Sequence, residues 1–397
     1  MSVPSSAIDI FSEPELLSPY DNYARLRALG SVVSLEAVGF KAITRYDAVR
    51  EALRDWRVFS SAEGVALDDA VNRALLGTTL SSDNPVHAER RKVVARPIGP
   101  AVIRDLADTI NAEANALVDR LMKRESFDAV QDLAWHLPLT IVSKFVGLPE
   151  ERRVEMLTWS EAISNVPGPN HSAADAAYLQ RKAIGFQNIG VMLNYMANEA
   201  SRDKLAPGSW GAMLYEAADR GEIEHDAVPS LLADYLGPSL DTTISALGSM
   251  VSLLIENPDQ WQRLRADRSL IPTAVVETVR IESPIQWFSR VVTTNHVVDG
   301  VALAQGERVI LLYGCANRDD RKYAAADRFD AGRDAADHLG WGHGVHACVG
   351  IHLARLEMQA ILTALLDRVQ QIEAAGQPER LVSTSFRALR HLPVRLR

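Results

Sequence analysis

The chain has 397 residues, 47% of them hydrophobic and 23% charged, which excludes a disordered chain and leaves ample material for a core. Its 42 basic and 51 acidic residues give 42 − 51 = −9, so the charge does not favour a nucleic-acid partner. Two cysteines, Cys315 and Cys348, cannot form a disulfide framework and suit a reducing cytoplasm. The first residues lack the pattern of a signal peptide, and no run of about 18 apolar residues predicts a membrane span.

Apolar residues at helical spacing dominate the chain. They predict helices over residues 100–121, 129–147, 172–200, 208–220, 226–256, 271–283 and 350–372. Short strand-like runs lie at 31–37, 40–44, 290–298, 307–313 and 381–396. Because no repeat, linker or regular alternation of strand and helix divides the chain, we expect one mainly α domain over residues 1–397 with a small β-rich portion.

The predicted helix 226–256 carries Pro238 in its middle. Proline has no N–H, so the carbonyl of Asp234 loses its helical donor and the helix is expected to bend or bulge there. Such an opening could hold a water molecule beside Asp241 and Thr242, and an acid followed by an alcohol suits proton delivery. Alternatively, Thr242 bonds back to the helix and Asp241 faces solvent.

The segment from His338 to Gly350 reads HLGWGHGVHACVG and precedes the last long predicted helix. Its glycines permit positive φ angles and a close approach of the backbone to something flat or bulky. Cys348 would lie near the positive end of that helix, where a thiolate is stabilised. From the residues alone, Cys348 could be a nucleophile, a metal ligand or a buried thiol, whereas Cys315 is expected to be a packed thiol.

The stretch Trp341–Gly350 resembles the haem-binding loop of the cytochromes P450, Phe-Gly-x-Gly-x-His-x-Cys-x-Gly, at every position but the first. Three more motifs stand in the order of that family, namely His87-Ala-Glu-Arg-Arg91, Asp241-Thr-Thr243 and Glu277-Thr-Val-Arg280. The resemblance covers residues 12–397. It implies the cytochrome P450 fold, a helical prism with small β-sheets, and a haem b cofactor with Cys348 as the iron ligand.

The resemblance also implies roles for residues around the haem. The two haem carboxylates would be bound by His87, Arg91, Arg290 and His346. Asp241 would relay protons from solvent, and Thr242 would hydrogen-bond the oxygen being activated or its water.

A buried structural triad is a further implication of the resemblance. It would join Glu277 and Arg280 to a later arginine, for which Arg328 matches best and Arg333 is the second choice. Breaking such a network is expected to prevent haem incorporation.

Weaker similarities, such as Leu205-Ala-Pro-Gly208 and Glu282-Ser-Pro-Ile-Gln286, indicate the bacterial group of this family that oxidises para-substituted benzoates. They place the substrate pocket at Ala233, Asp234, Gly237, Ile285 and Phe288. A carboxylate at Asp234 would repel a benzoate, so a neutral phenol or a cationic amine is favoured if Asp234 faces the pocket.

The sequence therefore predicts a cytoplasmic, monomeric haem-thiolate monooxygenase that hydroxylates or O-demethylates a small aromatic substrate. Two cysteines cannot ligate an iron–sulfur cluster, so electrons would come from a separate protein. The resemblance implies that this protein is a ferredoxin served by a ferredoxin reductase, with NAD(P)H as the ultimate source. A basic cluster at Arg90, Lys92 and Arg96 would bind the ferredoxin. The alternatives are a haem-binding sensor or carrier, and a cysteine hydrolase that uses Cys348 and His346.

Overall fold

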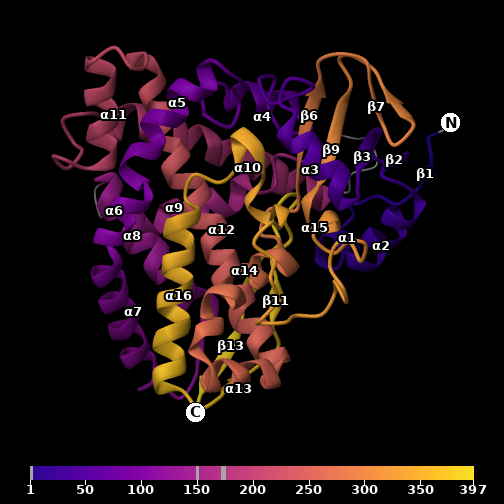
Figure 1. Cartoon of the computed structure of the whole chain (residues 1–397). Helices are drawn as coiled ribbons and strands as arrows, with labels where there is room; N and C mark the ends of the chain where they lie inside the picture. The colour runs from indigo at the N-terminus through magenta and orange to yellow at the C-terminus, as the bar shows by residue number, and fades with distance from the viewer. Residues whose placement is uncertain (1–2, 149–151, 171–175) are drawn as a thin grey trace.

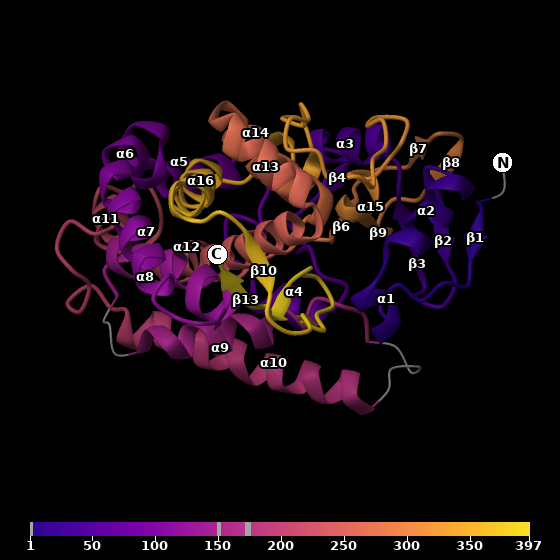
Figure 2. The ribbon, with the colours of Figure 1, turned by 90° about the horizontal axis from the view of Figure 1, so that it is seen from below.

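The computed structural model describes residues 3–148, 152–170 and 176–397. Long helices fill one part of the molecule, and the largest sheet lies with the N-terminus in the other, while strands near the C-terminus lie among the helices (Figure 1). In Figure 2, α9 and α10 form an outer layer on one side of α12, and α16 lies on the other side. The helices are α1 (Glu13–Leu17), α2 (Tyr20–Leu29), α3 (Tyr46–Arg54), α4 (Asp69–Ala74), α5 (Val86–Ala95), α6 (Pro100–Asp105), α7 (Ala107–Leu121), α8 (His136–Val146), α9 (Arg153–Ile163), α10 (Ala176–Asn194), α11 (Trp210–Asp219), α12 (Val228–Glu256), α13 (Pro258–Ala266), α14 (Ile271–Glu282), α15 (Tyr313–Ala316) and α16 (Ile351–Arg368).

The largest sheet has the strand order β1-β2-β3-β9-β6-β4. Strand β1 pairs parallel to β2, and β3 pairs parallel to β9. The remaining neighbouring strands of this sheet pair antiparallel. Smaller sheets have the orders β10-β13-β5, β11-β12 and β7-β8. The strands are β1 (Ser5–Ser6), β2 (Val32–Leu35), β3 (Phe40–Ile43), β4 (Phe59–Ser60), β5 (Phe127–Asp128), β6 (Trp287–Val292), β7 (His296–Val298), β8 (Val301–Leu303), β9 (Arg308–Leu312), β10 (Ile372–Ala374), β11 (Glu379–Arg380), β12 (Leu389–His391) and β13 (Pro393–Leu396).

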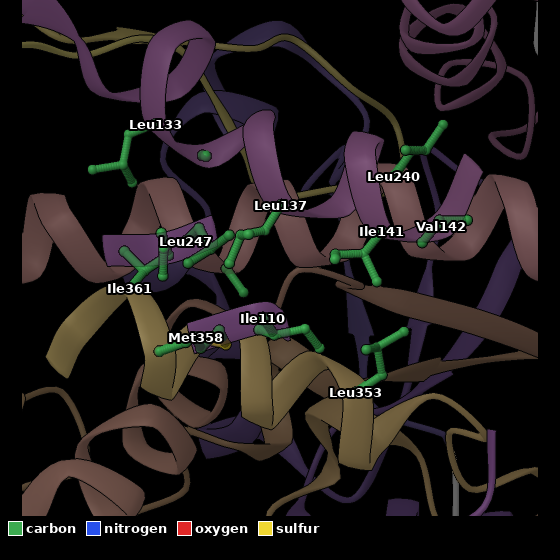
Figure 3. Close-up of a cluster of buried hydrophobic side chains, with 14 of the residues drawn as sticks. Ile110, Leu133, Leu137, Ile141, Val142, Leu240, Leu247, Leu353, Met358 and Ile361 are labelled. Carbon is green, nitrogen blue, oxygen red and sulfur yellow. The ribbon is translucent and has the colours of Figure 1, made fainter. Parts of the chain in front are cut away.

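The main core forms where α12 meets α7, α8 and α16. Figure 3 shows side chains of these helices in contact, among them Leu247 of α12, Leu137 of α8 and Ile361 of α16, all of which are fully buried. Burying one such side chain contributes about 1.5–3 kcal/mol. Many contacts of this kind therefore fix the position of α12, which carries Asp234, Asp241 and Thr242.

One helix, His225–Glu256, is long and apolar enough to cross a membrane by length and composition, which the sequence analysis did not anticipate. In the fold, 67% of its most apolar window is buried inside the protein. Contacts with α8, α14 and α16 in the core explain why this long helix is so apolar.

The structure confirms the mainly α fold with small sheets. The helices predicted around 208–220, 226–256, 271–283 and 350–372 form as α11, α12, α14 and α16, and the run 290–298 divides into β6 and β7. The sequence analysis missed α2, α3, α9 and α13. These are helices of 9 to 11 residues. In α13 only Gln260, Trp261 and Leu264 are buried, so its apolar stripe is too short to be distinctive.

Candidate functional site

A cavity of about 360 Å³ lies between α12, α16, β6 and the glycine-rich loop. Its wall is mostly apolar and brings together residues from Leu53 to Phe386. Every residue that the sequence placed in the substrate pocket lines it, together with Asp241, Thr242, Arg91, Arg290, His346 and Cys348.

The glycine-rich loop is folded tightly around Cys348. Gly342 and Gly344 both have φ of +69°, a conformation that side chains disfavour. A Cβ atom at Gly344 would lie 2.6 Å from the carbonyl oxygen of Leu53, so the loop could not rest against α3 with any other residue there. The Cys348 N–H donates to the carbonyl oxygen of Trp341 at 2.8 Å, which closes the loop.

The Cys348 thiol does not have the lowered pKa that its position before α16 predicted. Burial raises its pKa above the ordinary value, although the Gly350 N–H and the charge of Arg91 act in the opposite direction. A thiolate at this position therefore needs a further partner. Cys315 is fully buried with its pKa raised to about 12, as expected for a packed thiol.

One end of the cavity is basic. The rings of His87 and His346 lie 4.3 Å apart. The His87 Nε2 atom has no hydrogen-bond partner among the described residues, and the His346 Nε2 atom lies 3.9 Å from Asp83 Oδ1. Burial lowers the pKa of both, that of His87 to about 4, so both imidazoles are neutral at pH 7. Arg91 donates to the carbonyl oxygen of Ala347, and the buried Arg290 donates to that of Ser289.

Helix α12 continues as one helix through Pro238, from Val228 to Glu256. Space for a ligand is available at Gly237, where an added Cβ would meet nothing within 4 Å. The Thr242 hydroxyl donates to the Pro238 carbonyl oxygen at 2.6 Å, which is the back-bonded arrangement that the sequence left open.

Asp241 is enclosed rather than exposed to solvent. Burial raises its pKa to about 7, and an interaction with Ser160 of α9 only partly opposes this. Its side chain borders both the main cavity and a second cavity of about 380 Å³ among α9, α10 and α12. At neutral pH a substantial part of Asp241 is therefore protonated.

Asp234 faces the main cavity and is held by a backbone N–H from a distant segment, which no local sequence pattern indicates. Its Oδ2 accepts the N–H of Thr79 at 2.8 Å. Burial raises the pKa of Asp234 to about 6, and Arg90 and Arg91 act weakly in the opposite direction. These groups partly compensate the charge of the Asp234 carboxylate, which still adds negative charge to the cavity wall.

The structural triad contains Arg333, and the choice of Arg328 was wrong. The Arg280 Nε donates to Glu277 Oε2 at 2.6 Å, and the Arg333 Nε donates to Glu277 Oε1 at 3.0 Å. Arg328 is exposed and contributes only its carbonyl oxygen, which accepts from Arg333. Turns between residues 324 and 333 bring the later arginine to Glu277, and sequence spacing does not reveal this.

A second buried ion pair lies beside the cavity and was also missed. Lys182 of α10 lies 2.9 Å from Asp68, and both side chains are nearly inaccessible. Asp68 also accepts the N–H groups of Ala70 and Val71 at the start of α4. The pair joins two segments of the chain, and Val71 and Pro167 nearby line the cavity.

Comparison with known proteins decides the family. The family model described as Cytochrome P450 matches residues 210–386. The cytochrome P450 CYP199A2 of Rhodopseudomonas palustris is 35% identical over 99% of this chain and 95% of its own length. The chain belongs to the cytochrome P450 family. A linalool 8-monooxygenase of Pseudomonas putida is 30% identical over 95% of each chain. This P450 is accordingly a monooxygenase, an oxidoreductase of a haem-containing family.

The fold agrees with this assignment. The structure of Mycobacterium marinum cytochrome P450 CYP268A2 in complex with pseudoionone superposes over the whole of both chains with a TM-score of 0.88 at 28% identity. The structure of CYP109E1 from Bacillus megaterium in complex with testosterone has a TM-score of 0.87, covers 97% of this chain and 99% of its own, and is 24% identical. At that identity the second likeness concerns the fold alone.

The residues of the cavity fit the haem that the family implies. A flat apolar group with two carboxylates needs an apolar slot, one axial ligand and several hydrogen-bond donors at one end. This cavity offers the Cys348 thiol, an apolar wall, two arginines and the His346 imidazole, and the His87 ring lies against that of His346.

The corrected triad can be tested by removing each arginine separately. Arg333→Ala leaves the buried Glu277 carboxylate short of a charge partner, so we expect the free energy of unfolding to fall by about 3 kcal/mol and haem content to drop. Arg328→Ala, the matched control on the exposed side, should change stability by less than about 0.5 kcal/mol. Urea unfolding measures the stability of both variants, and haem absorbance measures their haem content. Equal losses in Arg333→Ala and Arg328→Ala would contradict the assignment of Arg333 to the triad.

Proposed function

We propose that this P450 inserts one oxygen atom from dioxygen into a small aromatic substrate, by hydroxylation or oxidative O-demethylation. The observation that supports it is the convergence of Cys348, a basic end and an acid–alcohol pair on one apolar cavity. Bound haem would supply the binding and reductive activation of dioxygen. The remaining steps depend on side chains of this chain.

In this proposal Cys348 supplies the thiolate that ligates the haem iron. Burial disfavours a free thiolate here, so the metal and the Gly350 N–H would compensate its charge. His87, Arg91, Arg290 and His346 would donate to the haem carboxylates. The neutral His87 imidazole can offer an Nε2–H, because no acceptor among the described residues takes it. The His346 Nε2 lies 3.9 Å from Asp83 Oδ1 and would exchange that neighbour for a haem carboxylate.

Asp241 and Thr242 would handle the protons that the reaction consumes. A carboxyl with a pKa of about 7 holds a proton at neutral pH and releases it readily, which suits a general acid. Thr242 would rotate from its bond with Pro238 to offer its hydroxyl to the cavity. A haem-binding sensor or carrier, the alternative function, would have no use for this pair.

Electrons from NAD(P)H would reach the protein through a ferredoxin and its reductase. Of the basic cluster, Lys92 is exposed, whereas Arg96 is paired with Glu222 at 2.5 Å and Arg90 reaches the Thr78 carbonyl oxygen. Lys92 is therefore the cation of this cluster that is best placed to attract an acidic ferredoxin. The proposal includes a single-domain monomer that works in the cytoplasm.

The proposed substrate is a small aromatic molecule without a carboxylate. The cavity wall near Ile285 and Phe288 is apolar and suits an aromatic ring. Asp234 adds negative charge to the same wall, and one of its oxygens is already bound to Thr79. The other oxygen can accept from a phenol or an ammonium group, while a benzoate would be repelled.

Cys348→His tests the ligand. Histidine can still bind haem iron, so we expect retained haem, loss of the far red-shifted Soret band of the reduced carbon monoxide complex, and loss of product formation. Cys315→Ala, which removes the buried thiol, is the control and should keep the native spectrum. A native carbon monoxide spectrum in Cys348→His would contradict the assignment.

Asp241→Asn tests proton supply. The Asp241 pKa is raised to about 7, so its acid form is present below pH 7 and is lost as the pH rises through 7. We expect the native ratio of product to NAD(P)H consumed to fall across that range. Asp241→Asn and Thr242→Ala should lose roughly 10²-fold in product formation and release hydrogen peroxide, and Asp241→Asn should show no such pH dependence. Ser239→Ala is the control, and full coupling in Thr242→Ala would place the proton path elsewhere.

The preference for substrate charge is tested by adding ligands of similar size but different charge and following the change in haem spin state. At pH 7 we expect 4-methoxybenzoate to bind roughly tenfold or more weakly than 4-methoxyphenol or a cationic 4-methoxybenzylamine, because Asp234 is ionised. Below the Asp234 pKa of about 6 the difference should shrink. Asp234→Ser should narrow or reverse this difference in affinity. Tight benzoate binding by the native enzyme would contradict the proposed substrate class.

A further inference from the structure

The second cavity, of about 380 Å³, lies among α9, α10, α12 and the C-terminal segment 381–390. In Figure 2, α9 and α10 form the layer outside α12, so the cavity lies beneath this outer layer. Asp241 and Phe386 line both this cavity and the main one. A space of this volume can hold a single aromatic ring with a short substituent.

One polar side chain in the second cavity has an unmet hydrogen bond. Asn165, two residues beyond the end of α9, is 7% exposed and lines the cavity. Its Oδ1 atom is buried and accepts from no donor among the described residues. The rest of the wall is mostly apolar and includes Trp135, Leu157 and Ile244. Because a buried acceptor without a partner is costly, a ligand that brings a donor to Asn165 would be bound preferentially.

The position of Asn165 is fixed by the residue before it. The carbonyl oxygen of Ser164 accepts the hydroxyl groups of three successive residues, Ser383, Thr384 and Ser385, at 3.0–3.1 Å. These hydrogen bonds hold the end of α9 against the C-terminal segment. The Asn165 acceptor is therefore held in one place, and the site is formed before a ligand enters it.

The charged residues around the second cavity do not favour an ionic ligand. Arg390 Nη2 lies 2.7 Å from Glu161 Oε1, and Arg181 Nη1 lies 3.3 Å from Glu13 Oε2. In the described part of the chain, each arginine that lines the cavity is thus already beside a carboxylate. Burial also keeps part of Asp241 in its neutral acid form by raising its pKa to about 7. A neutral molecule with one hydrogen-bond donor fits this wall best.

We propose that the second cavity is a binding site for a small neutral phenol, whose hydroxyl group donates to Asn165 Oδ1 and whose ring packs between α9 and α12. A phenol combines a neutral donor with a flat apolar body. A benzoate brings only acceptors, and a plain hydrocarbon ring leaves Asn165 unpaired. The O-demethylation included in the proposed function releases a phenol, so the product of that reaction belongs to the class that this site would bind.

A phenol in the second cavity would act on the main cavity through Asp241. The ring would lie against the outer side of this carboxyl and keep away the water through which protons reach it from solvent. This consequence rests on the proposed function, in which Asp241 supplies protons. A phenol would then lower the yield of product per NAD(P)H even when substrate saturates the main cavity.

Binding is tested on the purified holoenzyme with the main cavity filled by 4-phenylimidazole, whose ring nitrogen ligates haem iron. Equilibrium dialysis then measures the binding of 4-methylphenol and of 4-fluorotoluene, a molecule of similar size without a donor. We expect one saturable site that binds 4-methylphenol roughly tenfold more tightly than 4-fluorotoluene. In Asn165→Ala the affinity for 4-methylphenol should fall by about the same factor, and the preference between the two molecules should disappear.

Two further variants make this test specific. Asn188→Ala is the matched control, because Asn188 lines the same cavity but its Nδ2 already donates to the Ile184 carbonyl oxygen. It should keep the native preference. Ala162→Phe, which fills the cavity from α9, should abolish saturable binding of both molecules. Equal binding of the two molecules by native protein, or native binding in Ala162→Phe, would overturn the proposal. If Ala162→Phe does not fold, the Asn165→Ala comparison decides alone.

Turnover separates this site from the proposed function. At a concentration of 4-methylphenol equal to its dissociation constant, half of the sites are filled, so product per NAD(P)H should fall to about half with saturating substrate. Asn165→Ala should respond much less at that concentration. Binding without a change in this yield would refute the effect on Asp241. Failure of the native enzyme to oxidise any aromatic substrate would refute the proposed function, while the dialysis result still decides whether the site exists.

Discussion

The packing of α12 against α8 and α16, with α7 against α16, is the constraint on which the site depends. Helix α12 contributes one wall of the cavity, and α16 begins directly after the loop that presents Cys348. Both helices bury apolar faces in the same core. Close packing in this core therefore sets the distance between the acid–alcohol pair, Asp241 and Thr242, and the Cys348 thiol. The apolar residues of this core thereby determine the geometry of groups that never touch them.

Burial governs the charge state of nearly every ionisable group in the cavity. It raises the pKa of Cys348, Asp234 and Asp241 and lowers that of His87 and His346. All five shifts favour the neutral form, as expected when charged groups are withdrawn from water. The arginines cannot respond in this way, so they keep their charge and set the cavity's preference for anionic groups at the end where they lie.

The sequence predicted those parts of the site whose residues lie close together in short motifs. Cys348, His346 and the glycines lie within ten residues, and His87 and Arg91 share one turn of α5. The errors concern pairings between distant segments. Arg333 reaches Glu277 across 56 residues and Thr79 reaches Asp234 across 155, through turns whose conformation no local pattern encodes. The short helices α3 and α13 were missed for a related reason, since tertiary contacts rather than a long apolar stripe stabilise them.

Pro238 shows how a long, packed helix accommodates a residue that lacks a backbone donor. The missing N–H does leave the Asp234 carbonyl without its helical donor, but the packing of α12 keeps the helix continuous. The Pro238 carbonyl oxygen, one turn before Thr242, then accepts the threonine hydroxyl. A hydrogen bond of this kind contributes a net of about 0.5–1.5 kcal/mol, because the alternative partners are water or a ligand. That is small beside the contacts that hold α12, so Thr242 can exchange its acceptor when a ligand enters while the backbone stays in place.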